Sequence, residues 1–575
     1  MTALDWTVLF AWLATLVGYG LYRGRGSTTV NQFLLAGKTM PWYAMGLSIM
    51  ATQASAITFI STTALGYTDG MRFVQFYFGL PVAMVILCVT VVPIFHRAKV
   101  YTAYEYLERR FDPKTRGLIT GIFLISRGLQ SGIALSAPAI CLSIILGWPF
   151  EVTVGLMGGL VILYTTMGGI KAVTWADVPQ MFVILSALVL SLIVAVHLLP
   201  PDVSFFDAVR IAGAAGKINI VTTRFDWNDR YNLWSGLIGG SFLFLAYFGT
   251  DQSQVQRYLT GKSIGQSRLS LLLNAVAKVP MQAFILFIGA MVFVFFVFER
   301  PPLVFNPAES PRVEQSHQFG AIAASSDQAF DQRRAAAREI KDAHDSTARS
   351  AAITKFNEAQ KQFDAAHTAA TQVGKETDTN YIFLSFVTHY LPRGAVGLAL
   401  AVIFTAAMSA SSGEINSLAT VSIIDVYRRH FRPDLLNPDG TPTPGNDRHY
   451  LIASRVATAF WGLYAIAFAS YARSFGALIE TVNLVGSLFY GTMLGVFVLA
   501  FFVKRVRGTA AFMGVIAGQC VIFTVAGFTH IAYLWYNAIG CLVVIAVAVA
   551  VSFTRGRLDD DGLRPDNDGQ SSAGG

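Results

Sequence analysis

The stretch SIMATQASAITF, residues 48–59, interrupts a long apolar run with the polar side chains of Thr52, Gln53, Ser55 and Thr58. Inside a bilayer, a backbone polar group without a partner costs several kcal/mol, unless the chain lines a cavity at that point. Polar and small residues in the middle of a span therefore predict a discontinuous helix. Such helices are typical of the ion and substrate sites of transporters.

Long apolar runs extend along nearly the whole chain of 575 residues. Hydrophobic residues make up 54% of the sequence and charged residues 14%, against about 25% charged in an ordinary soluble domain. Each run has the length of a helix that spans a bilayer. The runs lie near residues 4–22, 41–66, 73–95, 117–146, 150–168, 176–199, 233–255, 269–298, 394–425, 449–471, 474–503, 508–528 and 532–554. The sequence therefore predicts an all-α polytopic membrane protein with about 13 transmembrane helices.

The basic residues predict the orientation of these helices. If the N-terminus lies outside, the segments on the inside hold most of the Lys and Arg residues of the short loops, among them Arg109, Arg428 and Lys504. The positive-inside rule then places the C-terminus in the cytoplasm. We expect a multi-pass protein of the plasma (inner) membrane, surrounded by the lipid bilayer and with no nucleic acid as partner.

Two stretches do not fit a membrane span. Residues 301–378 are polar and rich in good helix formers, which predicts an extracytoplasmic helical insertion. Residues 558–575 carry three aspartates at 559–561 and end in small residues, so we expect a disordered cytoplasmic tail. The rest of the chain divides into spans 1–8 within residues 1–300 and spans 9–13 within residues 379–557.

Polar residues also interrupt two later spans. Residues 406–416 in the ninth span are rich in serine and contain Glu414, and residues 247–256 close the seventh span with Asp251. One interpretation is a second discontinuous helix at residues 406–416. The other is close helix packing through small residues, which needs no binding site. The sequence contains no zinc-protease, phosphate-loop or nucleophile motif, so we do not expect an enzyme.

Five groups of residues, in this order along the chain, resemble the sodium:solute symporter family. They are FLLAG (33–37) with MPW (40–42) and residues 48–59; Tyr101 with EYL (105–107) and Arg110-Phe111; Gly168-Gly169 with WADV (175–178) and Gln180; Asp251-Gln252 with QRYL (256–259); and Met408-Ser409 with Asn416-Ser417 and DVY (425–427). The resemblance implies a LeuT-type inverted repeat of five plus five helices, at about residues 41–199 and 233–503. One leading helix and two trailing helices complete this fold, and the broken helices face a site near the bilayer midplane.

The resemblance also implies a sodium site between the second and ninth spans. Its ligands are the backbone carbonyls of Ala51, Ala54 and Ala406 and the hydroxyl of Ser409. An unwound helix supplies carbonyls that no longer bond within the helix, and these replace the hydration shell of the ion. The family usually has a second hydroxyl beside this serine, but Ala410 occupies that position here, so one ligand is lost.

Asp177 matches an acidic residue of the family at the start of the sixth span. The resemblance implies a way-station for the leaving cation, together with Ser412, which follows Ser409 by three residues on nearly the same helix face. A structural interpretation is a capping box, since Thr174 precedes Asp177 by three residues. These two roles are compatible.

The sugar-binding positions of the family's bacterial galactose symporter are not retained, apart from the gate aromatic Tyr247. The positions that we assign to substrate binding are Gln53, Thr58, Tyr77, Phe244, Tyr247 and Lys278. Hydrophobic walls with one basic side chain suit a small carboxylate or an amphipathic solute better than a hexose.

Glu414 stands where the family has an apolar residue. A carboxylate at this depth costs at least about 2.5 kcal/mol, so it must be paired, protonated or near water. Lys278 is the candidate partner for a buried pair. We expect sodium-coupled symport of a small organic solute by alternating access, with Na+ as the coupling ion. The alternatives are a proton-coupled symporter that uses Glu414 and a non-transporting solute sensor of the same fold.

Overall fold

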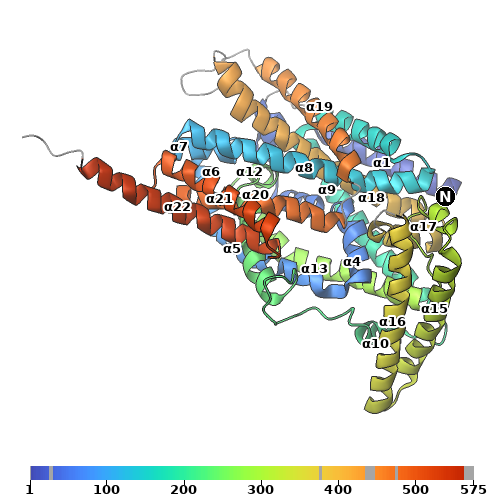
Figure 1. The fold of residues 1–575 in the computed structure, drawn as a ribbon. Helices are drawn as coiled ribbons and strands as arrows, with labels where there is room; N and C mark the ends of the chain where they lie inside the picture. The colour runs from blue at the N-terminus through green and yellow to red at the C-terminus, as the bar shows by residue number, and fades with distance from the viewer. Residues whose placement is uncertain (1, 25–29, 375–377, 434–446, 473–476, 562–575) are drawn as a thin grey trace, which may run out of the picture.

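The computed structural model describes residues 2–24, 30–374, 378–433, 447–472 and 477–561. All regular elements in these ranges are helices, beside one isolated bridge between Met40 and Gly261. The long helices α8, α9, α18 and α19 run side by side through the body of the protein (Figure 1). The first half of the chain contains α1 (Ala3–Gly24), α2 (Val30–Leu35), η1 (Ala36–Lys38), α3 (Trp42–Gln53), η2 (Thr58–Thr62), α4 (Thr63–Thr68), η3 (Gly70–Phe78), α5 (Gly79–Val89), α6 (Val91–Ala98), α7 (Ala103–Arg110), α8 (Pro113–Leu146), α9 (Phe150–His197) and α10 (Phe205–Ala214). The second half contains η4 (Ser235–Gly239), α11 (Gly240–Gly249), α12 (Gln252–Leu259), α13 (Ile264–Phe298), α14 (Ser310–Glu314), α15 (Phe319–Asp342), α16 (Ser346–Gly374), η5 (Thr379–Tyr381), α17 (Ile382–Tyr390), α18 (Ala395–Val421), η6 (Ser422–Phe431), α19 (Asp447–Ala472), α20 (Leu478–Phe502), α21 (Gly508–Phe528) and α22 (Leu534–Asp561).

Ten helices in the described part of the chain are long and apolar enough to cross a membrane, and a bent pair raises this number to 11. Two shorter apolar helices, Phe150–Leu163 and Ser235–Gly249, lie where the fifth and seventh spans were expected. The prediction of an all-α polytopic membrane protein is therefore confirmed. The exact number of 13 spans stays a prediction.

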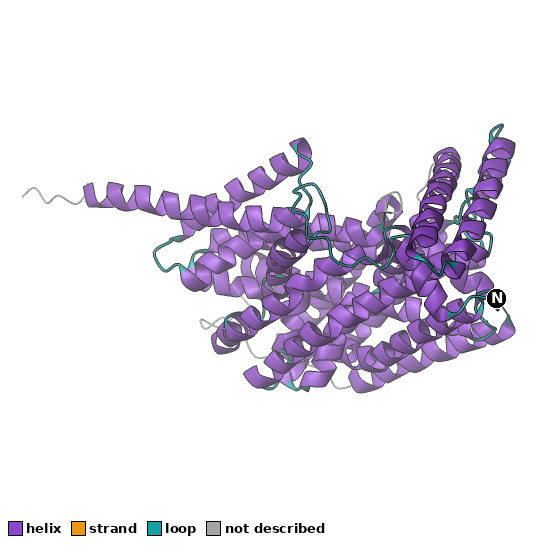
Figure 2. Cartoon of the chain, turned by 90° about the horizontal axis from the view of Figure 1, so that it is seen from below, coloured by secondary structure: helices purple, strands orange, loops and turns teal. Residues whose placement is uncertain are grey.

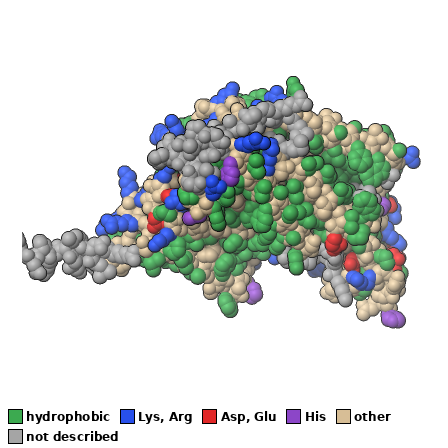
Figure 3. Space-filling model, turned by 90° about the horizontal axis from the view of Figure 1, so that it is seen from above, with side chains coloured by type: hydrophobic (Ala, Val, Ile, Leu, Met, Phe, Trp, Pro, Cys, Tyr) green, Lys and Arg blue, Asp and Glu red, His purple; other side chains and the backbone are tan. Residues whose placement is uncertain are grey.

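The outer surface agrees with a lipid environment. Hydrophobic side chains cover the middle of the face shown in Figure 3, and Lys and Arg gather toward its left edge. Large apolar residues are exposed on several of the long helices, among them Phe182, Ile193, Leu463 and Phe523. Water would not favour so much exposed apolar surface, whereas hydrocarbon accepts it.

The second span is broken, as residues 48–59 predicted. Helix α3 ends at Gln53, and Ala54 leaves the helical conformation with φ −89° and ψ 50°. The axis of η2 and α4 is bent by 62° from that of α3. The apolar part of the seventh span ends with α11 at Gly249, and the polar helix α12 begins at Gln252.

The ninth span is not broken, so the interpretation of residues 406–416 as a discontinuous helix was wrong. Helix α18 runs from Ala395 to Val421 and is buried along its second half. The Ser412 hydroxyl bonds to the Ser409 carbonyl oxygen of the same helix at 3.0 Å, and the Ser409 hydroxyl bonds to Asp177 of a neighbouring helix. Because these hydroxyls find partners while the backbone stays helical, they do not force the helix to open.

Spans five and six are two helices that follow each other directly within α9, joined by a sharp kink at Gly169. The φ of Gly169 is +59°, in a region that a residue with a side chain rarely adopts. A β-carbon there would lie 2.8 Å from the carbonyl oxygen of Phe33. Glycine is thus required by both the backbone angle and the contact with α2.

The predicted insertion contains α14, α15 and α16. Helices α15 and α16 pair along their length and project from the body of the protein (Figures 1 and 2). Their apolar side chains continue into a core with α10 and α13, in which Ala337 and Phe356 pack with Phe293 and Val297. The insertion is therefore a hairpin anchored on two elements of the body.

Two polar contacts hold the base of this hairpin. The buried Arg333 donates to the carbonyl oxygen of Phe296 at the end of α13 and lies 3.8 Å from the ring centroid of Phe363. Asp378 accepts the backbone N–H groups of Phe305 and Asn306 at 2.8 and 2.7 Å. Burial raises the pKa of the Asp378 carboxyl to about 6, although these two hydrogen bonds lower it.

The C-terminal tail was expected to be disordered from residue 558. Helix α22 instead continues to Asp561, because the last polar residues extend an established helix at little cost. The remainder of this predicted tail, residues 562–575, lies outside the described residues.

Candidate functional site

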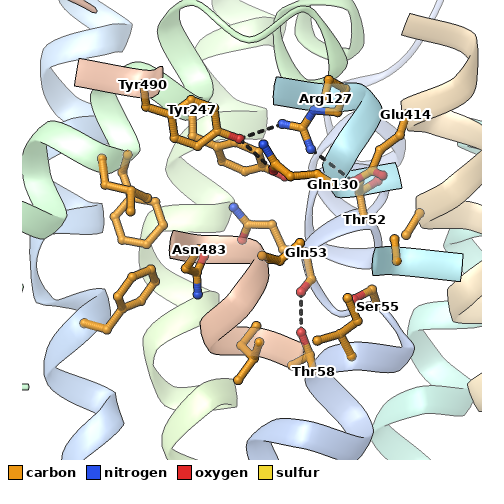
Figure 4. A pocket seen from close by; sticks show the side chains of 18 of the residues that line it. Thr52, Gln53, Ser55, Thr58, Arg127, Gln130, Tyr247, Glu414, Asn483 and Tyr490 are labelled. Atoms are coloured by element: carbon orange, nitrogen blue, oxygen red, sulfur yellow. Dashed lines mark hydrogen bonds and ion pairs between the residues drawn. The ribbon is translucent and has the colours of Figure 1, made fainter. Parts of the chain in front are cut away.

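A cavity lies at the break in the second span, between α3, η3, α8, α11, α18 and α20. Five of the residues predicted to bind substrate line it: Gln53, Thr58, Tyr77, Phe244 and Tyr247. The sixth, Lys278, does not. Figure 4 shows the polar side chains of this cavity, which come from helices far apart in the sequence.

The broken end of α3 forms one wall. The Thr58 hydroxyl donates to the backbone carbonyl of Gln53 at 2.7 Å, across the break (Figure 4). The side-chain oxygen Oε1 of Gln53 is buried and has no hydrogen-bond partner among the described residues. Such an atom is costly unless a ligand or water supplies a partner.

Aromatic rings form the opposite wall. The rings of Tyr77 and Phe244 are stacked with their centroids 5.6 Å apart. The Tyr247 ring lies 6.0 Å from that of Tyr490, and its hydroxyl accepts a hydrogen bond from Gln254 at 2.7 Å. The cavity thus combines apolar faces with a few fixed polar atoms, as small-molecule sites commonly do.

The charged centre of the cavity is Arg127, which the sequence analysis did not single out. Its Nη1 lies 3.0 Å from Glu414 Oε1, and its Nη2 pairs with Asp251 and donates to the Tyr490 hydroxyl at 2.8 Å. All four side chains are almost completely buried. A lone arginine in the middle of an apolar run is itself a signal of a functional site, and it was available in the sequence.

The predicted pair between Glu414 and Lys278 is therefore wrong. Glu414 uses Arg127, because α8 packs directly against α18 and brings the guanidinium to the carboxylate. Lys278 is completely buried on α13, with no hydrogen-bond partner and no carboxylate within 4.0 Å among the described residues. Its Nζ lies 5.6 Å from the ring centroid of Tyr77, whose side chain lines the cavity.

Side chains from three other helices meet at Asp177 of α9. The buried carboxylate accepts hydrogen bonds from Ser48 Oγ at 2.5 Å and from Ser409 Oγ, and it lies 3.1 Å from Arg257 Nη1. Ser48 belongs to α3, which carries Ala51 and Ala54 near its C-terminal end. Ser409 belongs to α18, which also carries Ala406. The structure thus brings the predicted sodium ligands onto two helices that touch.

The capping-box interpretation of Asp177 was wrong. The Thr174 hydroxyl donates to the Ile170 carbonyl at 2.8 Å, and both Thr174 and Asp177 lie inside α9. The second helix of α9 begins directly after Gly169, so its N-terminus lies ahead of these two residues and they do not cap it. The carboxylate of Asp177 is free to bond across helices instead.

The comparison with known families agrees with this geometry. A profile of the Sodium:solute symporter family matches residues 33–326 and 355–518. The chain belongs to the sodium:solute symporter family. The residues between the two matched stretches, 327–354, lie in the hairpin of α15 and α16.

This symporter is similar to several characterised relatives. It is 26% identical to the sodium/sialic acid symporter NanT of Aliivibrio fischeri, over 95% of this chain and 92% of the relative. It is 25% identical to the human sodium-coupled monocarboxylate transporter 1, over 90% of this chain and 72% of the relative. A solved structure of a Na+-coupled sialic acid symporter in an outward-open state has the same fold, with a TM-score of 0.74 and 23% identity over 96% of this chain and 98% of that one.

These findings confirm that the chain is a sodium-coupled secondary transporter of a solute, with Na+ as the coupling ion, and not an enzyme. They do not favour proton coupling or a sensor role.

Proposed function

We propose that this symporter takes up a small organic carboxylate together with sodium, across the plasma (inner) membrane. The N-terminus lies outside and the C-terminus in the cytoplasm, in agreement with the distribution of Lys and Arg in the short loops. One sodium ion moving down a potential of about 100 mV supplies about 2.3 kcal/mol, before any concentration gradient is counted.

In this proposal, sodium binds where α3 breaks beside α18. The ligands are the carbonyl oxygens of Ala51, Ala54 and Ala406 and the hydroxyl oxygen of Ser409. The proton of the Ser409 hydroxyl points to Asp177 in the structure, which leaves the oxygen lone pairs for an ion. Asp177 and Ser412 form the way-station by which the ion leaves.

The observation that carries the carboxylate proposal is the isolated ammonium of Lys278. A buried charge without a partner is costly, and an incoming anion would supply the missing counter-charge. Tyr77 separates Lys278 from the cavity, and rotation of this side chain would join the two. Gln53, Thr58, Phe244 and Tyr247 then contact the rest of the solute. Relatives that carry monocarboxylates and sialic acid are consistent with this class of solute.

Uptake into proteoliposomes tests the proposal. We expect a sodium gradient to drive accumulation of labelled butyrate or of another short carboxylate, and the matched amides to compete poorly. Lys278→Met should remove the preference for carboxylate over amide, whereas Lys262→Met, on an exposed loop, should keep it. Equal competition by carboxylates and amides in the parent protein would contradict the carboxylate proposal.

A further inference from the structure

The carboxylate of Glu414 has one oxygen that nothing in the described chain satisfies. Oε1 is paired with Arg127 Nη1 at 3.0 Å, but Oε2 is buried without a hydrogen-bond partner. Only 7% of Glu414 is exposed, and the side chain lines the cavity. An unpaired carboxylate oxygen in such a place is a binding position for a positively charged hydrogen-bond donor.

The charges around this oxygen favour a cation. Arg127 is shared between Asp251 and Glu414, so this cluster carries one net negative charge when both carboxylates are ionised. Among the residues described as lining the cavity, Arg127 and Glu414 are the only charged ones. Arg257 also lies near Glu414, but it is paired with Asp177, and Lys278 lies over the ring of Tyr77.

The neutral groups around Glu414 favour a cation as well. The C-terminal end of α3, with its partial negative charge, meets the cavity at Thr52 and Gln53. Gln53 adds a buried oxygen without a partner. The ring of Tyr247 already faces the guanidinium of Arg127, 5.5 Å from its centroid, so this wall of the cavity is compatible with positive charge.

We propose that Glu414 Oε2 binds an ammonium group of the solute. If the proposed function is right and the solute also carries a carboxylate, the solute of this symporter is an amino carboxylate. Its two charges are recognised separately, the ammonium by Glu414 and the carboxylate by Lys278.

Matched solutes test this inference in the unmodified protein. Binding is measured by calorimetry on the purified full-length chain in sodium, with straight carboxylates from acetate to hexanoate. Each is compared with its α-amino and ω-amino derivatives. We expect at least one amino carboxylate to bind about tenfold more tightly than the carboxylate of equal length, as one charged hydrogen bond would provide.

Two variants show whether Glu414 is responsible. Glu414→Gln should abolish the advantage of the amino derivative over the carboxylate of equal length, measured as the ratio of the two affinities within the variant. Glu480→Gln removes a carboxylate of α20 that pairs with Arg230 outside the cavity, and it should keep that advantage.

Three results would overturn the inference. In the first, no amino derivative binds better than its matched carboxylate, and carboxylate binding then still supports the proposed function. In the second, Glu414→Gln weakens the binding of sodium and of every solute equally, which would mean that Glu414 acts through the sodium ion. In the third, neither series binds, and the carboxylate proposal fails as well.

Discussion

The guanidinium of Arg257 packs directly on Gly413, so that a β-carbon at position 413 would overlap Nη2. Gly413 lies on α18, in the turn after Ser409, and Arg257 holds Asp177 from α12. The absence of a side chain at position 413 therefore allows Arg257 to reach the carboxylate that also accepts the Ser409 hydroxyl.

Gly413→Ala should displace this arginine. Overpacking of a buried contact costs about 1–3 kcal/mol, and we expect a lower midpoint of thermal unfolding together with altered sodium dependence. Gly121→Ala on α8 is the matched control, because no atom lies within 4 Å of a β-carbon there. A parent-like unfolding midpoint for Gly413→Ala would show that Arg257 moves aside freely.

Ser409→Ala should remove the only side-chain ligand proposed for sodium. We expect a large increase in the sodium concentration needed for half-maximal uptake, and the opposite change for Ala410→Ser, which restores a second hydroxyl. Ser417→Ala, whose hydroxyl bonds to the Glu414 carbonyl, is the control on the same helix. Equal uptake in sodium and choline for all four proteins would refute this ion site.

Arg127→Met should leave Asp251 and Glu414 buried without their shared cation. Breaking a buried pair in this way typically costs about 3–5 kcal/mol. The double variant Arg127→Met/Glu414→Gln removes one of the stranded charges, so it should be more stable than Arg127→Met alone. Thermal unfolding in detergent measures this difference, and a double variant no more stable than the single one would argue against the coupling.

The stability of the hairpin should depend on pH through His367. Burial lowers the pKa of this imidazole from 6.5 to about 4, so the folded hairpin favours the neutral ring. The stability that the neutral His367 ring contributes to the hairpin is fully present above about pH 6.5 and is lost as the pH falls toward 4. Asp378, with a raised pKa of about 6, contributes in the opposite sense, with stability lost as the pH rises from about 4 to 6.

Hydrogen exchange of the hairpin amides between pH 4 and 7 measures both effects. His367→Gln should reduce the loss of amide protection at acid pH. Asp378→Asn should remove the gain in amide protection that protonation of the Asp378 carboxyl provides as the pH falls. His344→Gln, at an exposed position between α15 and α16, should change neither. Identical pH profiles for the parent and His367→Gln would exclude a role of this ring.

The features predicted correctly from the sequence are those that depend on residues close together in the chain. The mixture of polar and small residues at 48–59 identified the break in the second span, and the apolar runs identified the membrane helices. The same pattern misled at residues 406–416, because a serine can bond within its own helix as readily as across a broken one. Local composition does not distinguish these two outcomes.

The partners of buried charges could not be predicted, because they depend on how distant helices are rotated and packed. Glu414 was expected to form an ion pair with Lys278, but it forms one with Arg127 on α8. Asp177 resembled a helix cap, but the kink at Gly169 places it well inside α9. In both cases the partner is distant in the chain. Arg127 and Glu414 are 287 positions apart, and Asp177 and Ser409 are 232 positions apart, so each pair comes into contact only in the folded protein.

The anchored hairpin has a practical consequence for imaging. Helix α16 has 29 residues, which corresponds to a rod of about 43 Å at 1.5 Å per residue. A small transporter inside a detergent micelle offers few features by which single particles can be aligned. Because Arg333 and the shared apolar core fix this rod to α13, it can serve as a built-in fiducial for electron cryo-microscopy, and as a rigid epitope for an antibody fragment.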